Sequence, residues 1–211
     1  MAFLITQSLV SAWAYMFDCA EGREEAARED FERTLRREKG ETTDAMQAGI
    51  DFENAVYAEA DGLPREDTNW EQGVKEVASI IRGSQVQVKL SRTITVDSEE
   101  YLVYGVLDAL KAGTIFDVKF TSKGGGLKEN DFYGKYLSSP QHPFYFYLVP
   151  EAREFRYLLS DGKDTYIETY HPAECRNAES IIREFITSIK EMGYLDTYKK
   201  HWVALHQAQS I

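Results

Sequence analysis

The hydrophobic period of the chain changes in its middle third, and this change limits the fold more than any other feature. Over residues 86–97 apolar and polar side chains alternate, which predicts a half-buried β-strand. Two further apolar runs, Tyr101–Leu110 and Thr114–Thr121, are separated only by the turn residues Lys111–Gly113. Three consecutive strands joined by short turns predict an antiparallel β-meander.

The segments on both sides of the meander have the three- and four-residue spacing of helices, apart from one strand pair. The predicted helices cover 3–38, 44–60, 69–82, 141–149, 173–191 and 195–208, and the predicted strands cover 154–159 and 165–170. This order predicts an α/β (α+β) fold, in which helices flank a central mixed β-sheet. We expect one domain, 1–211, with a helical N-terminal part (1–82), a sheet core (83–172) and C-terminal helices (173–211).

The composition is that of a soluble globular protein, with 43% hydrophobic and 28% charged residues among 211. The apolar segment 1–17 does not resemble a signal peptide, because the first basic residue is Arg23 and no small-residue cleavage site follows. No apolar run reaches the ~18 residues that a membrane span needs. We therefore expect a cytoplasmic protein that makes no membrane contact.

The net charge of −11, taken alone, argues against a nucleic-acid partner. A site for divalent cations must concentrate carboxylates, however, and the bound ions then reverse the local sign of the charge. The charge also leaves open a second class, an acidic interaction protein that imitates DNA. Such a mimic would spread its acids over one surface and would not place one inside an apolar strand.

Asp108 lies inside an otherwise apolar strand, where a carboxylate is costly unless it is paired or bound to a metal. The hairpin through the turn at 111–113 places Asp117 beside it, and Lys119 projects from the same face as Asp117. Two carboxylates, with the carbonyl of Val118, would suit Mg²⁺. The plainer interpretation is a salt bridge from Asp117 to Lys119, with Asp108 paired elsewhere.

The motif Gly105-x-x-Asp108, followed after a turn by Asp117-x-Lys119, resembles the core motif of the PD-(D/E)XK nuclease superfamily. Three more segments resemble its RecB-like branch, which includes phage recombination exonucleases and CRISPR-adaptation nucleases. They are the opening helix, the helix on which a glycine precedes a metal ligand by four positions, and the Gln-x-x-x-Tyr helix. In this chain they correspond to Ser8–Cys19, Gly49 to Glu53, and Gln141 to Tyr145.

The resemblance implies a restriction-endonuclease-like core and a Mg²⁺- or Mn²⁺-dependent DNA nuclease, most simply an exonuclease of recombination, repair or phage type. It implies that Glu53 joins Asp108, Asp117 and the Val118 carbonyl as a metal ligand. Lys119 would complete the catalytic set, by orienting water or stabilising the phosphorane. The alternative is a catalytically silent nucleic-acid-binding or protein-interaction module on the same fold.

Gln141 and Tyr145 share a helix face and are predicted to contact substrate, with core packing the alternative for the tyrosine. A second group of basic and aromatic residues could form a path for single-stranded nucleic acid. It comprises Lys123, Lys128, Lys135, Phe132, Tyr133 and Tyr136. A solvated glycine-rich loop is the equally weighted alternative. The four histidines have no ligand spacing and are interpreted as structural, His142 being the one of interest because it adjoins Gln141.

The chain departs from some members of this branch. The iron–sulphur members have four cysteines, whereas this chain has only Cys19 and Cys175, so no iron–sulphur cluster is expected. There is no P-loop motif, so unwinding would have to come from a partner such as a helicase or a single-strand annealing protein. A homo-oligomer is expected only by analogy with family exonucleases.

Overall fold

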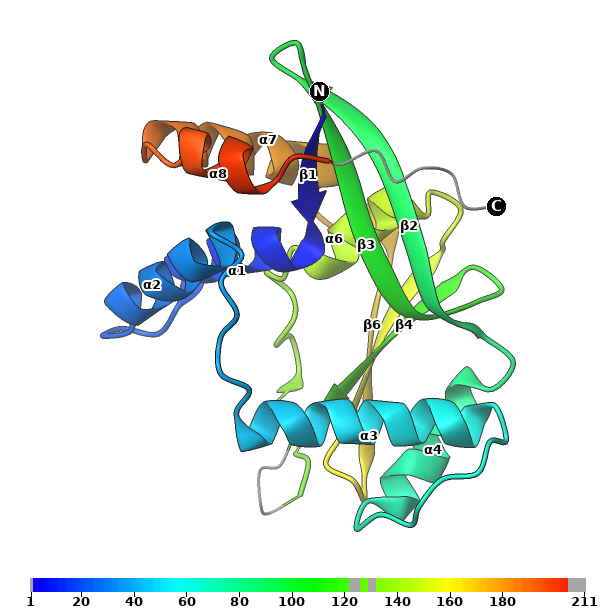
Figure 1. The fold of residues 1–211 in the computed structure, drawn as a ribbon. Coiled ribbons are helices and arrows are strands. Elements are labelled where there is room, and N and C mark those ends of the chain that lie inside the picture. Colours follow the sequence, from blue (N-terminus) through cyan, green and yellow to red (C-terminus); the bar gives the residue numbers. More distant parts are fainter. Residues whose placement is uncertain (1, 122–125, 129–131, 205–211) are drawn as a thin grey trace.

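The computed structural model describes residues 2–121, 126–128 and 132–204 (Figure 1). Helices lie on both sides of one sheet. The strands are β1 (Phe3–Thr6), β2 (Gln85–Val96), β3 (Glu99–Lys111), β4 (Thr114–Phe120), β5 (Glu154–Ser160) and β6 (Thr165–Tyr170). The helices are α1 (Gln7–Asp18), α2 (Glu24–Leu35), α3 (Asp44–Ala60), α4 (Glu71–Ile81), α6 (Gln141–Leu148), η1 (Pro172–Glu174), α7 (Ala178–Glu191) and α8 (Leu195–His201).

The sheet is mixed and has the order β1-β3-β4-β5-β6, with β2 paired to β3 outside this path. The β2–β3 and β3–β4 hairpins and the β5–β6 pair are antiparallel, while β1 pairs with β3 and β4 pairs with β5 in parallel. The predicted meander and the predicted mixed sheet flanked by helices are both confirmed. The turn between β3 and β4 uses Ala112 and Gly113, both with positive φ, as two-residue hairpins require.

Two apolar cores cover the two faces of the sheet. On one face α1, α6 and α7 pack against β3 and β5, and on the other face α3 and α4 pack against β4 (Figure 1). Ile115 points into the first core, while Phe116 and Val118 point into the second. Because both faces are covered, β4 reads in the sequence as an apolar run without alternation, and its polar members are conspicuous.

The structure corrects the predicted helix over 3–38. Phe3–Thr6 is the strand β1, which pairs in parallel with Tyr101–Tyr104, and Thr6 then caps α1 by accepting a hydrogen bond from the N–H of Leu9. The rest of this segment is two helices, since the chain turns at Gly22, where φ is +81°. A short apolar run has no helical or strand identity of its own, and here a distant strand decides it.

The two predicted C-terminal helices are also shorter than expected. The helix predicted over 173–191 begins only at Ala178, after Asn177, whose side chain accepts from the N–H of Ser180 at 3.0 Å. The helix predicted over 195–208 ends at His201, because Val203 forms a β-bridge with Phe3. Residues 205–208 lie outside the described part.

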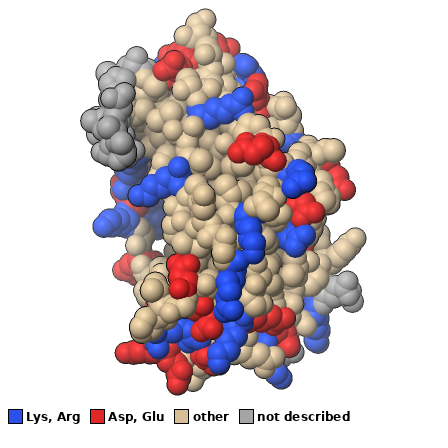
Figure 2. All heavy atoms as spheres, turned by 90° about the vertical axis from the view of Figure 1, so that its right-hand side faces the viewer, with Lys and Arg blue, Asp and Glu red and all other residues tan. Residues whose placement is uncertain are grey.

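Among the described residues, none of the helices is long and apolar enough to cross a bilayer. Figure 2 shows one face of the molecule, on which basic side chains run down the middle with acidic side chains beside them. On this face the net charge of −11 is therefore not spread as a uniformly acidic surface.

Gly105 lets α6 approach β3, and this gives a prediction about stability. A Cβ atom at Gly105 would lie 2.7 Å from Tyr145 Cε1 and 2.9 Å from Leu148 Cδ1. Gly105→Ala should therefore lower the free energy of unfolding by about 1–3 kcal/mol through overpacking. As a matched control, Gly49→Ala on α3 meets open space and should raise it by about 0.5–1 kcal/mol. Urea unfolding measures both, and equal effects of the two variants would contradict the prediction.

His142 gives a second prediction. Its ring is buried, stacks on Tyr170 at 4.2 Å between centroids, and lies within hydrogen-bond distance of the Tyr157 hydroxyl. Burial lowers the pKa of His142 from 6.5 to about 4. In that interval the unfolded chain binds a proton that the folded chain does not, so acidification should reduce the free energy of unfolding by up to about 1.4 kcal/mol per pH unit. In His142→Phe this part of the pH dependence should disappear. Denaturation measured between about pH 4 and 7 tests this: if the free energies of unfolding of the two proteins change in parallel with pH, the prediction is wrong.

Candidate active site

The hairpin of β3 and β4 brings Asp108 and Asp117 to the point where the two strands separate. The β3–β4 ladder includes Ala109 opposite Phe116, and the next positions along this register are the two aspartates. No ladder pair joins them. Instead the backbone N–H of Val118 donates to Asp108 Oδ2 at 2.8 Å. Because the β3–β4 ladder ends here, the N–H of Val118 is not paired with β3 and can donate to the Asp108 carboxylate.

Asp117 is the most buried of the predicted acids, with 4% of its surface exposed. Gln141 of α6 donates from Nε2 to Asp117 Oδ1 at 2.5 Å. Lys119 Nζ lies 2.7 Å from Asp117 Oδ2 as an ion pair. Each carboxylate oxygen has two lone pairs, so Oδ2 can accept a further partner beside the ammonium.

Glu53 reaches the site from α3, on the opposite side of the hairpin from α6. Its carboxylate accepts a hydrogen bond from the hydroxyl of Tyr57, one helical turn further along α3. Gln87 of β2 donates from Nε2 to Glu53 Oε1 at 3.3 Å and to the Tyr57 hydroxyl at 3.0 Å. Burial, the Asp108 charge and the bond to Glu53 raise the pKa of Tyr57, so this hydroxyl stays a donor.

The electrostatics join these groups into one cluster. Burial, followed by the charges of Asp117 and Glu53, raises the pKa of Asp108 well above its ordinary value, while Lys119 and the Val118 N–H oppose the shift. Burial lowers the pKa of Lys119, but Asp117 and Asp108 outweigh it and raise that pKa above its usual value. The cluster has three acids against one ammonium and therefore carries negative charge that a cation would relieve.

The donor set suits a hard divalent cation. Carboxylate oxygens are the ligands that Mg²⁺ and Mn²⁺ prefer, and Glu53, Asp108 and Asp117 supply them. In the described part of the chain, however, no three acidic, histidine or cysteine side chains are grouped tightly enough to hold an ion together. Glu53 is held by Tyr57 and Gln87. The chemistry of the residues thus fits a metal, although the acids are not grouped tightly around one point in this structure.

The two residues predicted to contact substrate from α6 are both buried and both bonded to the strands. Gln141 is committed to Asp117, as described above. The Tyr145 hydroxyl donates to the carbonyl oxygen of Val106 at 2.8 Å, and its ring lies against Gly105. In this arrangement they support the acidic cluster, and their contact with substrate stays a prediction.

Of the predicted nucleic-acid path, Lys123 lies outside the described residues. Lys135 Nζ lies over the rings of Phe132 and Tyr136, at 5.3 and 5.5 Å from their centroids. Tyr136 stacks on Tyr157 at 4.0 Å, and burial raises the pKa of Tyr136 to about 12, with Lys119 opposing and Asp117 supporting the shift. Tyr136 therefore lies near Lys119 and Asp117, while the nucleic-acid path itself stays a prediction.

Sequence reasoning missed Tyr57, Gln87 and Tyr157. Tyr57 had a signal, since it lies four positions after Glu53 and shares its helix face. Gln87 had none, because glutamine on an exposed strand edge is unremarkable. Its φ of +51° costs a non-glycine residue roughly 1–2 kcal/mol and is visible only in the structure.

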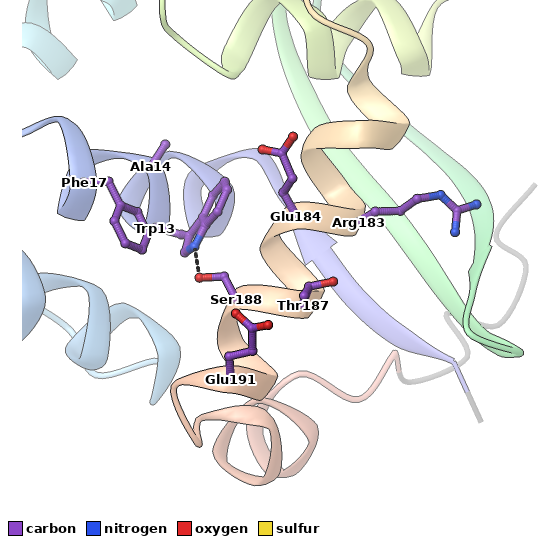
Figure 3. Close-up of a pocket in the computed structure, with 8 residues that line it drawn as sticks. All are labelled: Trp13, Ala14, Phe17, Arg183, Glu184, Thr187, Ser188 and Glu191. Atoms are coloured by element: carbon purple, nitrogen blue, oxygen red, sulfur yellow. Dashed lines mark hydrogen bonds between the residues drawn. The ribbon is translucent and has the colours of Figure 1, made fainter.

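The predicted site does not coincide with the cavity between α1 and α7. Figure 3 shows this cavity, about 570 Å³ in volume, where Trp13 donates from Nε1 to Ser188 Oγ at 3.0 Å. Its lining residues are Trp13, Ala14, Phe17, Arg183, Glu184, Thr187, Ser188 and Glu191. None of the predicted catalytic residues is among them. All of the lining residues come from α1 and α7.

Comparison with known proteins found no matching family model and no similar curated sequence. Solved structures do match. LHK-Exo in complex with dAMP has a TM-score of 0.55 at 14% identity, with 93% of each chain covered. The alkaline exonuclease structure (LHK-Exo) from Laribacter hongkongensis has a TM-score of 0.53 at 16% identity, again covering 93% of each chain. The structure of SSO0001 has a TM-score of 0.52 at 14% identity, covering 91% of this chain and 77% of that one.

The sequence identities are low, so the structural matches establish the fold alone. Each match covers at least 91% of the present chain. The fold that the resemblance implied is thereby confirmed. The chain has the fold of alkaline exonucleases such as LHK-Exo.

Proposed function

We propose that this protein is a divalent-metal-dependent nuclease that hydrolyses phosphodiester bonds in DNA. The observation that carries the proposal is the cluster of Asp108, Asp117 and Lys119 at the point where β3 and β4 separate. Buried charges of this kind stabilise a fold poorly, because desolvation offsets their attraction. A phosphoryl-transfer site needs such charges, and the fold shared with an alkaline exonuclease supports that use.

In this proposal Glu53, Asp108 and Asp117 hold Mg²⁺ or Mn²⁺, with the Val118 carbonyl as a further oxygen ligand. A divalent cation there supplies Lewis-acid polarisation of the phosphate and activates water for attack. Gln141 fixes the plane of the Asp117 carboxylate through its 2.5 Å hydrogen bond, and Oδ2, which Lys119 contacts, keeps a second lone pair for the cation. The Val118 N–H likewise orients the Asp108 carboxylate, by donating a hydrogen bond to its Oδ2.

Lys119 acts as a charge and not as a base. The neighbouring carboxylates raise its pKa, so its ammonium keeps its proton at neutral pH. With 34% of its side chain exposed, Lys119 can reach both Asp117 and an incoming phosphate. It therefore stabilises the negative charge that develops on the phosphorane or orients the attacking water.

DNA is the proposed substrate, and exonuclease action of recombination, repair or phage type is the finer proposal. Both are supported by the LHK-Exo structure, which was solved with dAMP. Lys135, which is exposed near the acidic cluster, would receive the phosphates of a single strand. A helicase or single-strand annealing partner and a homo-oligomer stay predictions.

A catalytically silent binding module is the second candidate. Such a module gains nothing from a buried acid that faces phosphates, since like charges repel. The Asp117 carboxylate, 4% exposed and paired with Lys119, therefore favours the enzyme over the binding module.

The role of Lys119 gives the first prediction of activity. Lys119→Ala should reduce Mg²⁺-dependent cleavage of end-labelled linear DNA by at least about 100-fold, as loss of a transition-state donor does. Lys119→Gln should be similarly impaired, because it keeps a donor but loses the charge. Lys200→Ala, on the exposed side of α8, is the control and should cleave like the wild type. Full activity in Lys119→Ala would show the catalytic assignment to be wrong.

The role of Asp117 gives the next prediction. Asp117→Asn keeps the shape of the side chain and an acceptor for Gln141, yet removes the negative charge. Cleavage in Mg²⁺ or Mn²⁺ should fall below detection while circular dichroism stays unchanged, and chelation should abolish wild-type activity. Linear and circular DNA tested side by side separate exonuclease from endonuclease action. A variant that still digests DNA in metal would refute the ligand role.

A further inference from the structure

Gln87 has a backbone conformation that strands do not normally contain. Its φ is +51°, and it is the one residue inside a described strand with a positive φ. The other described non-glycine residues with positive φ lie in hairpin turns or after a helix end, where this conformation is expected. They are Arg37, Asp97, Ser98 and Ala112. A strained residue within a strand persists only when its surroundings enforce it, and such residues gather at functional sites.

This residue lies directly across from Asp108. In the β2–β3 register, the position opposite Gln87 is Asp108, and the ladder skips this one pair. Pairing continues on both sides of the gap, through Val86–Ala109 and Val88–Leu107. The sheet also turns here, because Val86 and Ala109 pack into the core of α3 and α4, whereas Val88 and Leu107 pack into the other core.

At this position in β2 the side chain of Gln87 is directed toward α3. Its amide reaches α3 and donates both to the Tyr57 hydroxyl at 3.0 Å and to Glu53 Oε1 at 3.3 Å. The Tyr57 hydroxyl donates to the same carboxylate oxygen. Two donors, one from β2 and one from α3, therefore hold Oε1 of Glu53. This arrangement fixes a flexible side chain in one orientation and leaves its second oxygen out of the triangle.

We propose that Gln87 and Tyr57 are positioning residues for Glu53, and that the left-handed turn of β2 exists to bring the Gln87 amide to that carboxylate. The inference rests on the proposed nuclease function and deepens it, since it concerns how the acid from α3 is presented to a divalent cation. Carboxylates that bind metals are commonly held by hydrogen bonds of this kind, and loss of these bonds weakens metal affinity about 10- to 100-fold.

The rival explanation is that the triangle only anchors α3 to the sheet. Direct Mn²⁺ binding without DNA, measured by calorimetry or electron paramagnetic resonance, separates the two explanations when it is compared with thermal unfolding. Gln87→Gly tolerates the positive φ and removes the whole side chain with its amide. Tyr57→Phe removes only the hydroxyl. Gln85→Ala, two positions away on the same strand, and Ala55→Gly, a destabilising change on α3, are the controls.

We expect the Mn²⁺ dissociation constant to rise about 10-fold or more in Gln87→Gly and in Tyr57→Phe. Gln85→Ala should bind like the wild type, and Ala55→Gly should melt earlier without a change in Mn²⁺ affinity. Wild-type affinity in folded Gln87→Gly and Tyr57→Phe would overturn the inference. So would an affinity loss in Ala55→Gly as large as theirs, since this would mean that anchoring of α3 is what matters.

The same series distinguishes this failure from failure of the nuclease proposal. If Glu53→Ala and Asp117→Asn lose Mn²⁺ binding while Gln87→Gly keeps it, only the positioning role is wrong. If the wild-type protein binds no Mn²⁺ and cleaves no DNA, the nuclease proposal itself fails and takes the inference with it.

Discussion

The burial of Asp117 is the constraint on which the site depends. A carboxylate with 4% of its surface exposed needs partners, and the chain provides Gln141 from α6 and Lys119 from its own strand. The first of these fixes α6 against the sheet, and the second keeps an ammonium where phosphate charge would develop. The Lys119 ammonium uses one lone pair of Oδ2, and the second lone pair is left over. A group that is buried and incompletely satisfied is better suited to binding a cation than to stabilising a core.

The sheet is built so that this charge lies at a seam. The strands β3 and β4 part just beyond Ala109 and Phe116, and on the other edge of β3 the ladder skips the pair at Gln87. Asp108 therefore lies where regular pairing is interrupted on both of its edges. Interrupted pairing exposes peptide groups, and the Val118 N–H is used to hold the Asp108 carboxylate. At this point a hydrogen bond from a backbone N–H to a carboxylate replaces the pairing between strands.

Most of the architecture could be predicted because it follows from local patterns. The apolar run of β4 contains Asp117 and Lys119 as its polar exceptions, so the sequence itself marked the site. The β3–β4 turn at Ala112 and Gly113 set the register that places Asp108 next to Asp117. The segment 3–6 was predicted wrongly as helix, because its strand identity comes from Tyr101–Tyr104, almost a hundred residues away.

The sequence by itself determined the order of the elements, the fold class and the residues that carry charge inside an apolar strand. Periodicity and turn residues are local, so they can be read without coordinates. Only the tertiary structure decided three hydrogen bonds. They join Gln141 to Asp117, the Tyr145 hydroxyl to the Val106 carbonyl, and Gln87 to Glu53. These contacts join residues 24, 39 and 34 positions apart. They depend on how helices pack on both faces of the sheet, which no local pattern encodes.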